Sequence, residues 1–173
     1  MNDIQNHSTE LTKTLQKLVN GHYIFTTKKS ADEMTTRDKD YYAAGVVSWV
    51  TQTSFNPPQV MVALKKNSDL KETVSKSYVF ALNLLGKKNT GMIEPFGKES
   101  SVKDGQINGF SFEEGKTGSP VFGDVPACLE CRVSEIIDTK GDHHLVLGEV
   151  INCELRDDVE IMTEKDTEWR YGG

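Results

Sequence analysis

The chain has 173 residues and a formal net charge of −6 at pH 7, a length that fits one domain or one domain with an appendage. The acidic balance argues against a nucleic-acid partner, which would need clustered Lys and Arg. No apolar run approaches the roughly 20 residues that span a bilayer, and the first ten residues lack the basic and apolar parts of a signal peptide. We therefore expect a cytoplasmic protein without a membrane or nucleic-acid partner.

A helix, a strand and a loop are predicted for the first quarter of the chain. Residues 10–20 carry apolar side chains at helical spacing, between an N-cap candidate at Ser8 and an Asn-Gly pair that is typical of a helix end. The positions on the apolar face are Leu11, Leu15, Leu18 and Val19. Residues 22–27 are predicted as a strand, and the charged residues 28–42 as a loop at the rim of a ligand site. Residues 1–10 are expected to form a flexible N-terminus.

The stretch from residue 44 to residue 64 is the most informative part of the sequence. Two runs rich in β-branched residues flank the polar residues 51–54, and Pro57-Pro58 fixes an extended turn after them. We predict two strands joined by a polar connection, whose hydroxyl and amide groups line a rim suited to a phosphorylated or carbonyl-bearing ligand. The alternative is a β-hairpin with a polar connection that binds nothing.

The rest of the chain is richer in strands than in helices. The further predicted elements are a helix at 69–76 capped by Ser68, a strand at 77–85 buried on both faces, a short helix at 89–96, a long excursion at 98–120, and strands at 128–137 and 144–155. This spacing favours a Greek-key barrel with peripheral helices over alternating βαβ units. No glycine-rich dinucleotide turn or P-loop is present, so neither of those nucleotide-binding folds is indicated.

Three cysteines cannot form a complete disulfide framework. Cys128 and Cys131 have C-x-x-C spacing, but residues three apart on a strand point to opposite faces. No second cysteine pair supplies the other ligands of a zinc site. We therefore predict ordinary reduced cysteines and no metal site.

Several motifs occur in an order that is similar to that of one family. They are G-V-V-S-W-V-T-Q-T-S-F-N-P-P at 45–58, K-K-N-S at 65–68, F-A-L-N-L-L at 80–85, A-C-L-E-C-R-V at 127–133 and G-D-H-H at 141–144. Together they resemble the flavin reductase-like family of FMN-binding split barrels, and the resemblance covers residues 11–173. We expect residues 1–173 to form a single domain. The chain looks close to the module attached to flavodiiron proteins and rubredoxin-fused reductases. The resemblance implies a mainly β split barrel, a homodimer, FMN as cofactor, and NADH or NADPH as reductant.

FMN requires polar partners for its phosphate and ribityl chain, and flat apolar walls with donors for its ring. The candidates for the phosphate and ribityl contacts are Thr51, Ser54, Lys65, Lys66 and Ser68. The resemblance implies that Val47, Ser48 and Trp49 run alongside the isoalloxazine ring, although Trp49 is equally suited to a core. Asn83 lies in an apolar strand and needs a partner, either a polar edge of the flavin or the backbone.

Two further positions are candidates near the ring. His143 follows a Gly-Asp turn and changes charge near neutral pH, and the family's G-D-H pattern implies a place beside flavin or nicotinamide. The alternative is a turn histidine between strands. The C-terminal segment contains Trp169 and Tyr171, which either cover the ring or seal the barrel or a dimer interface.

The expected function is electron transfer from NAD(P)H through FMN to free flavin, a metal centre or a protein partner. FMN is expected to bind better than FAD because Thr51, Ser54, Ser68 and a lysine would make one phosphate site. Two alternatives remain at this point. One is a non-catalytic flavin-binding module that another protein reduces, and the other is a cofactor-free β-barrel interaction domain.

Overall fold

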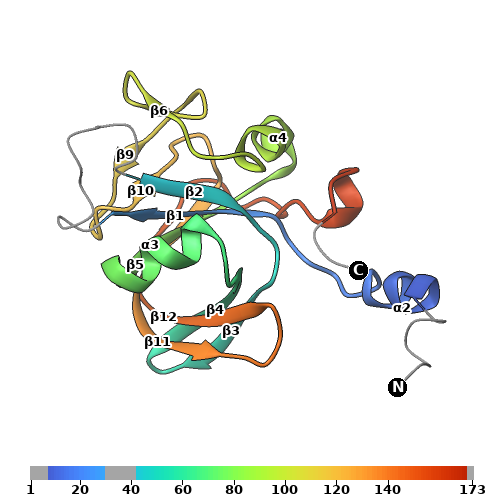
Figure 1. The fold of residues 1–173 in the computed structure, drawn as a ribbon. Helices are drawn as coiled ribbons and strands as arrows, with labels where there is room; N and C mark the ends of the chain where they lie inside the picture. The colour runs from blue at the N-terminus through green and yellow to red at the C-terminus, as the bar shows by residue number, and fades with distance from the viewer. Residues whose placement is uncertain (1–7, 30–41, 171–173) are drawn as a thin grey trace.

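A computed structural model describes residues 8–29 and 42–170 (Figure 1). The larger elements are α2 (Ser8–Leu15), β1 (Tyr23–Lys28), β2 (Tyr42–Val47), β3 (Val50–Phe55), β4 (Pro58–Lys65), α3 (Asp69–Ser77), β5 (Val79–Leu84), η2 (Lys87–Met92), α4 (Ile93–Phe96), β11 (Ala127–Asp138), β12 (His143–Leu155) and η3 (Glu164–Asp166). Five two-residue strands lie between α4 and β11, namely β6 (Val102–Lys103), β7 (Gln106–Ile107), β8 (Phe110–Ser111), β9 (Glu113–Glu114) and β10 (Pro120–Val121). Within the described ranges, no helix combines the length and the apolar character needed to cross a membrane.

One antiparallel sheet of seven strands, in the order β2-β1-β5-β11-β12-β4-β3, forms the body of the protein. The edge strands β2 and β3 are consecutive in the chain, and only Ser48 and Trp49 join them. Strands lie about 4.8 Å apart, so a flat sheet would separate its edges by roughly 29 Å. The three Cα steps from Val47 to Val50 span at most about 11 Å. The sheet must therefore curl, as Figure 1 shows, and the predicted mainly β split barrel with peripheral helices is confirmed.

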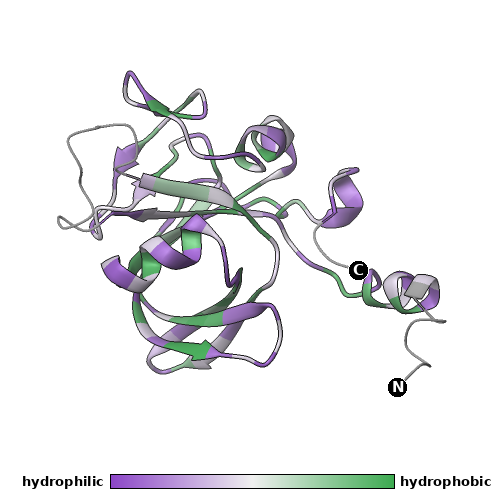
Figure 2. Ribbon diagram, in the orientation of Figure 1, coloured by the Kyte–Doolittle hydropathy of each residue, from purple (hydrophilic) through white to green (hydrophobic). Residues whose placement is uncertain are grey.

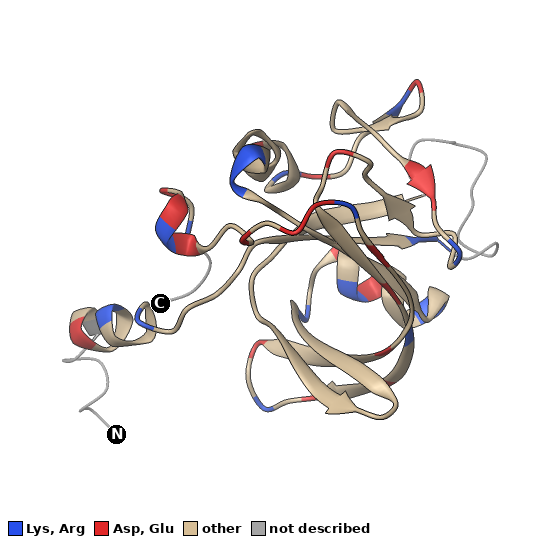
Figure 3. Ribbon diagram, turned by 180° about the vertical axis from the view of Figure 1, so that it is seen from behind, with Lys and Arg blue, Asp and Glu red and all other residues tan. Residues whose placement is uncertain are grey.

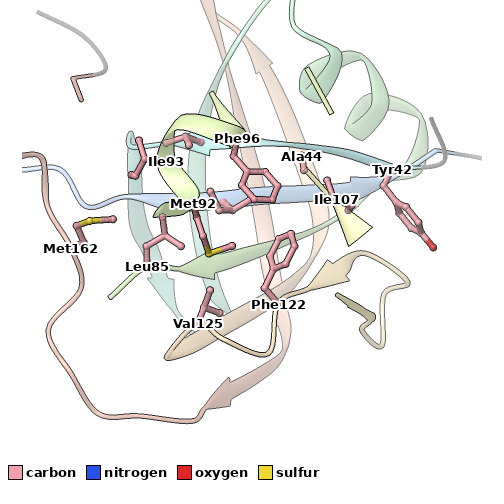
Figure 4. Close-up of a cluster of buried hydrophobic side chains, with 12 residues drawn as sticks. Tyr42, Ala44, Leu85, Met92, Ile93, Phe96, Ile107, Phe122, Val125 and Met162 are labelled. Carbon is pink, nitrogen blue, oxygen red and sulfur yellow. The ribbon is translucent and has the colours of Figure 1, made fainter. Parts of the chain in front are cut away.

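Two main clusters of buried apolar side chains hold the curled sheet together. Figure 4 shows the first, in which the rings of Phe96 and Phe122 meet edge to face at 5.2 Å and pack with side chains from η2 and β2. In the second, the rings of Phe25 and Phe80 are stacked with centroids 4.8 Å apart. A Cβ at Gly148 would lie 2.5 Å from Phe80, so only glycine lets β12 cross this ring.

The predicted N-terminal helix ends earlier in the structure than the sequence indicated. Helix α2 stops at Leu15 instead of residue 20, and it projects from the body of the protein (Figure 1). Leu18 and Val19, which were expected to extend its apolar face, follow the turn at residues 16–17 and are each 64% exposed. Figure 2 shows apolar colour on this projecting segment. A short helix without a packed face is marginal, which explains the early end.

The polar residues 51–54 do not connect two strands, because they are themselves part of strand β3. This strand pairs with β4 from Val50, opposite Val62, to Phe55, opposite Pro58. The prediction of a polar connection was wrong because this edge strand is largely exposed and its sequence lacks the alternation of apolar and polar residues that marks a half-buried strand. By contrast, the prediction of a strand near 77–85 that is buried on both faces is confirmed by β5.

The two C-x-x-C cysteines point away from each other, as predicted. Cys128 packs with Ala81 and Val121, whereas Cys131 packs in the cluster that contains Phe80. Burial raises the pKa of the Cys131 thiol to about 12, and it also raises the pKa of Cys128. Both thiols are therefore protonated and unreactive at neutral pH.

Glu130 on β11 anchors the loop that precedes β10. Its buried carboxylate accepts hydrogen bonds from the backbone N–H of Thr117 at 2.8 Å, the Thr117 hydroxyl at 3.0 Å and the Asn152 amide at 2.7 Å. Burial alone would raise the pKa of Glu130, but these hydrogen bonds outweigh it and lower the pKa from its ordinary value of 4.5. The charged form is thus the one that the fold stabilises.

We predict that Glu130→Gln lowers the free energy of unfolding by about 2–3 kcal/mol at neutral pH. The substitution replaces one carboxylate oxygen by an NH2 group, which cannot accept a hydrogen bond, and it removes the charge that strengthens the bond at the other oxygen. Glu135→Gln, on the exposed part of the same strand, is the matched control. The contribution of Glu130 is present above pH 4.5 and is lost as pH falls through its lowered pKa in the folded state. Urea unfolding from pH 7 to pH 3 measures this, and a difference between variant and wild type that stays constant over this range would contradict the assignment.

Candidate functional site

A groove of about 540 Å³ lies where the curled sheet leaves β2 and β4 side by side. Its walls come from β2, the end of β4, the start of α3, the segment after α4, and Trp169. We call it the β2–β4 groove. Its volume falls in the range of small-molecule sites, which is roughly 300–1,000 Å³.

The link between the two sheet edges shapes one end of this groove. The Ala63 amide donates to the Trp49 carbonyl at 3.0 Å, which fastens the Ser48-Trp49 link to β4. Helix α3 packs over the seam, and a Cβ at Gly45 would lie 3.1 Å from the Leu70 side chain. The glycine therefore lets the helix approach β2 closely, so that strand backbone lines the groove.

The polar part of the groove lies at the start of α3. Ser68 is the N-cap of this helix, where its hydroxyl accepts from the Lys71 amide at 3.2 Å and donates to the Lys65 carbonyl at 2.7 Å. Lys65 also lines the groove, and within the described residues its ammonium group has no ion pair. A cation and a hydroxyl beside a helix N-terminus form an arrangement suited to a phosphate.

Three of the predicted site residues, Val47, Lys65 and Ser68, are brought together as walls of the groove. Trp49 and His143 form a pair beside them, with ring centroids 4.7 Å apart, and His143 lies directly opposite Lys65 in the sheet. The Nδ1 atom of His143 is 2.7 Å from the Asp142 carboxylate, and this hydrogen bond lowers the pKa of Asp142. His143 is thus oriented at the edge of the groove.

The structure places the other candidates away from the groove walls. Thr51 and Ser54 lie on β3, and Ser54 pairs with Gln59, six residues before Lys65 on β4. At about 3.3 Å per residue the separation along the strand is roughly 20 Å, so the single phosphate site expected from Ser54, Ser68 and a lysine does not form within the chain. Thr51 and Ser54 are close to Ser68 in the sequence but distant from it in the structure, because the extended strand β3 leads away from α3.

Two candidates have structural partners instead. Asn83 is fully buried, its amide nitrogen lies 3.3 Å from the carbonyls of Ile24 and Pro120, and its oxygen accepts from the Phe122 amide at 2.9 Å. It thus takes the backbone alternative rather than a ligand edge. Lys66 is 2.6 Å from the Asp138 carboxylate and also donates to a carbonyl of the β11–β12 turn, which directs it away from the groove.

Ser48 is buried and its hydroxyl lies 2.9 Å from Nδ1 of His22, so its side chain does not line the groove. Tyr171 lies outside the described residues. The wall residues that sequence reasoning missed include Gly45, Leu70 and Phe96. No local signal marks them, because their neighbours in the groove come from distant parts of the chain.

A second cavity of about 470 Å³ lies between the start of η2, the turn before β11 and the segment after β12. It contains none of the predicted site residues. Three cations line it. Lys87 lies 3.5 Å from the Glu160 carboxylate and 3.4 Å from that of Asp166, Arg156 pairs with Glu154, and Lys88 has no ion pair within the described residues. Its described lining contains no aromatic side chain, whereas Phe96 and Trp169 line the β2–β4 groove, which is therefore the better candidate for a ligand with a planar ring.

Comparison with known proteins supports one family. A family model described as flavin reductase like domain matches residues 15–169. The diflavin flavoprotein A 1 of Synechocystis sp. is 29% identical over 145 residues, which are 83% of this chain and 24% of that protein. The chain spans about a quarter of the length of the diflavin flavoproteins that it matches.

Solved structures share the fold. The NADH:FAD oxidoreductase of Streptomyces globisporus has a TM-score of 0.75 at 21% identity, over 94% of this chain and 85% of that chain. The flavin reductase of the styrene monooxygenase of Pseudomonas putida has a TM-score of 0.69 at 21% identity, over 87% of this chain and 88% of that chain. At these identities the likeness concerns the architecture.

Proposed function

The chain belongs to the flavin reductase like domain family, and on this premise we propose that it binds FMN in the β2–β4 groove and transfers electrons from NADH or NADPH to an acceptor. FMN, when bound, supplies the redox chemistry of the reaction. The contribution of the chain is to bind the phosphate, to enclose the ring and to orient the groups at the edge of the groove.

The observation that carries this proposal is the division of the groove into a polar and an apolar part. Lys65 and Ser68 provide a cation and a hydroxyl at the start of α3, whereas Val47, Phe96 and Trp169 provide apolar and aromatic walls. A ligand with a planar ring and a phosphate on a polar chain fits such a groove. The second cavity lacks this combination, since no aromatic side chain is among its described lining residues.

His143 is the proposed catalytic residue at the edge of the groove. Asp142 holds its Nδ1 atom and Trp49 packs against its ring, so that the imidazole has a defined orientation next to Lys65. A protonated imidazole there would add positive charge near the ligand and would favour electron uptake. Hydride transfer itself needs no general base from the protein.

The acceptor is proposed to be free flavin, a metal centre or a protein partner. The diflavin flavoproteins contain a much longer chain than the matched part, which favours an acceptor in another protein segment. The names of the Streptomyces and Pseudomonas neighbours instead favour free flavin. The rate of NADH or NADPH oxidation over many turnovers, measured once with free FMN or FAD and once with a protein acceptor, distinguishes these alternatives.

We also propose a homodimer. Four large apolar side chains on and after α2 are at least 44% exposed, namely Leu11, Leu15, Leu18 and Val19. Apolar colour on the projecting helix in Figure 2 marks this surface, which favours association. A second copy of the chain would cover it in a symmetric pair.

We predict that Lys65→Gln weakens FMN binding about ten- to a hundredfold, because a charge-assisted phosphate contact contributes about 1.5–3 kcal/mol. Riboflavin, which has the same ring and no phosphate, should bind the variant as it binds the wild type. Lys66→Gln is the matched control, since Lys66 is held by Asp138. Fluorescence titrations with FMN, riboflavin and FAD measure this, with FMN expected to bind more tightly than FAD. An equal loss for FMN and riboflavin would place the phosphate elsewhere.

His143→Ala is expected to slow reduction of the flavin by NADH or NADPH about tenfold, which corresponds to about 1.4 kcal/mol in the barrier, with little change in FMN affinity. His144→Ala is the control, because its Nε2 atom is bound to Asp138 at 3.0 Å. Stopped-flow absorbance measures the reduction rate. If both variants reduce the flavin as fast as the wild type, His143 is a turn residue. If the wild type binds flavin that neither nicotinamide reduces, the protein is a non-catalytic electron-transfer module.

Leu18→Glu is expected to convert the dimer to a monomer, because it places a charge in an apolar contact. Lys13→Glu on the same helix changes charge without removing apolar area and should leave the dimer intact. Sedimentation velocity at micromolar concentration measures both. A wild-type monomer with flavin bound would refute the dimer.

A further inference from the structure

His22, a residue without an assigned role, lies buried between the Ser48-Trp49 link and the C-terminal segment. Its Nδ1 atom is 2.9 Å from the Ser48 hydroxyl. Its ring meets the indole of Trp169 edge to face, with centroids 5.2 Å apart and planes at 76°. The side chain is completely inaccessible to solvent. One imidazole therefore contacts both the link between the sheet edges and an aromatic wall of the groove.

The charge state of His22 suits a supporting role. Burial lowers the pKa of His22, and the nearby carboxylates of Glu164 and Asp166 only partly oppose this effect, which Arg170 reinforces. The imidazole is therefore neutral at neutral pH. Its Nε2 atom is buried and has no hydrogen-bond partner in the described part of the chain, so the ring contacts Trp169 through packing.

The C-terminal segment that carries Trp169 is fastened beside His22. The His22 amide donates to the Met162 carbonyl at 2.9 Å, and an isolated bridge pairs Gly21 with Thr163. The next element is η3, with the sequence Glu-Lys-Asp, and both charge colours are visible on it in Figure 3. The Arg170 guanidinium then donates to the backbone carbonyls of Glu164 and Thr167. The backbone of this segment is thus held at both ends.

Trp169 extends from this segment to the groove. Trp169 is one of the walls, and its Nε1 atom would be 3.8 Å from a Cβ at Gly97, another wall residue. Backbone bonds hold the segment but do not fix the rotation of the indole. The contact with His22 provides that restraint from one side, and Ser48 in turn restrains His22.

We propose that Ser48 and His22 are positioning residues that hold the Trp169 indole as an aromatic wall of the β2–β4 groove, against which the flavin ring packs. This inference rests on the proposed function for the identity of the ligand, but the positioning itself does not. It assigns to Ser48 an indirect role, through His22, instead of a direct contact with the ligand. The serine of the motif thereby couples the link between the sheet edges to the C-terminal wall.

Acrylamide quenching of Trp169 tests the positioning without any flavin. The chain has two tryptophans, so in a Trp49→Phe background the emission comes from Trp169 alone. Ser48→Ala and His22→Phe should each make this emission more accessible to acrylamide and shift it to the red. Thr27→Val, which removes a buried hydroxyl from β1 that bonds to Ser77 and Val79, is the matched control and should leave quenching unchanged.

Flavin titration tests the consequence for the ligand, in chains that retain Trp49. Loss of ring packing should weaken FMN and riboflavin equally, by roughly three- to tenfold, since aromatic packing rather than a phosphate contact is lost. Ser48→Ala removes only one hydroxyl and serves if His22→Phe fails to fold. Unchanged acrylamide quenching in Ser48→Ala would overturn the positioning role. Increased quenching with unchanged riboflavin affinity would overturn the claim that the ring packs on Trp169, whereas a wild type that binds no flavin would refute the proposed function alone.

Discussion

Chain continuity between the two edges of one sheet is the constraint on which the rest of this structure depends. Strands β2 and β3 stand at opposite edges of seven strands, yet two residues join them. The sheet can satisfy this only by curling until β2 lies beside β4. Among the described strands, β2 and β4 are not paired in the sheet, so α3 and the C-terminal segment cover this seam, and the space they leave is the β2–β4 groove.

The same constraint explains why the groove has two kinds of surface. Strand β4 ends at Lys65 next to the N-cap of α3, so a cation, a hydroxyl and a helix start meet at one place. Along β2 the approach of α3 over Gly45 leaves backbone and apolar side chains as the wall. In the proposed function, the way the chain closes the sheet thus provides a surface for a ligand that is charged at one end and planar at the other. The groove does not require a glycine-rich phosphate loop.

Much of the fold was predictable because it rests on local patterns. The buried strand β5 and the helix capped by Ser68 follow from apolar runs and capping chemistry, and both are present. Of the predicted site residues, Val47, Lys65 and Ser68 line one groove, whose role as a flavin site stays a proposal. What local patterns could not show is which polar residues face the groove. Ser54 lies on an exposed edge strand and Asn83 bonds to the backbone.

The aromatic wall was the least predictable part of the site. Trp169 reaches the groove only because Met162 and Thr163 pair with residues 21 and 22, at the other end of the chain, and no periodicity reports such a contact. Phe96 likewise belongs to a four-residue helix that is placed by the core in Figure 4. Ser48 was predicted to lie beside the ring, but its hydroxyl bonds to buried His22, and in the proposed positioning role it acts through that residue.

Hydrogen–deuterium exchange of the protein with and without FMN tests most directly the claim that the β2–β4 groove is the flavin site. Bound flavin should slow exchange at backbone amides of residues 44–47, 63–65 and 68–70, which border this groove. Exchange near residues 86–89 and 123–126, which border the second cavity, should stay unchanged. Protection confined to the second cavity would contradict the account.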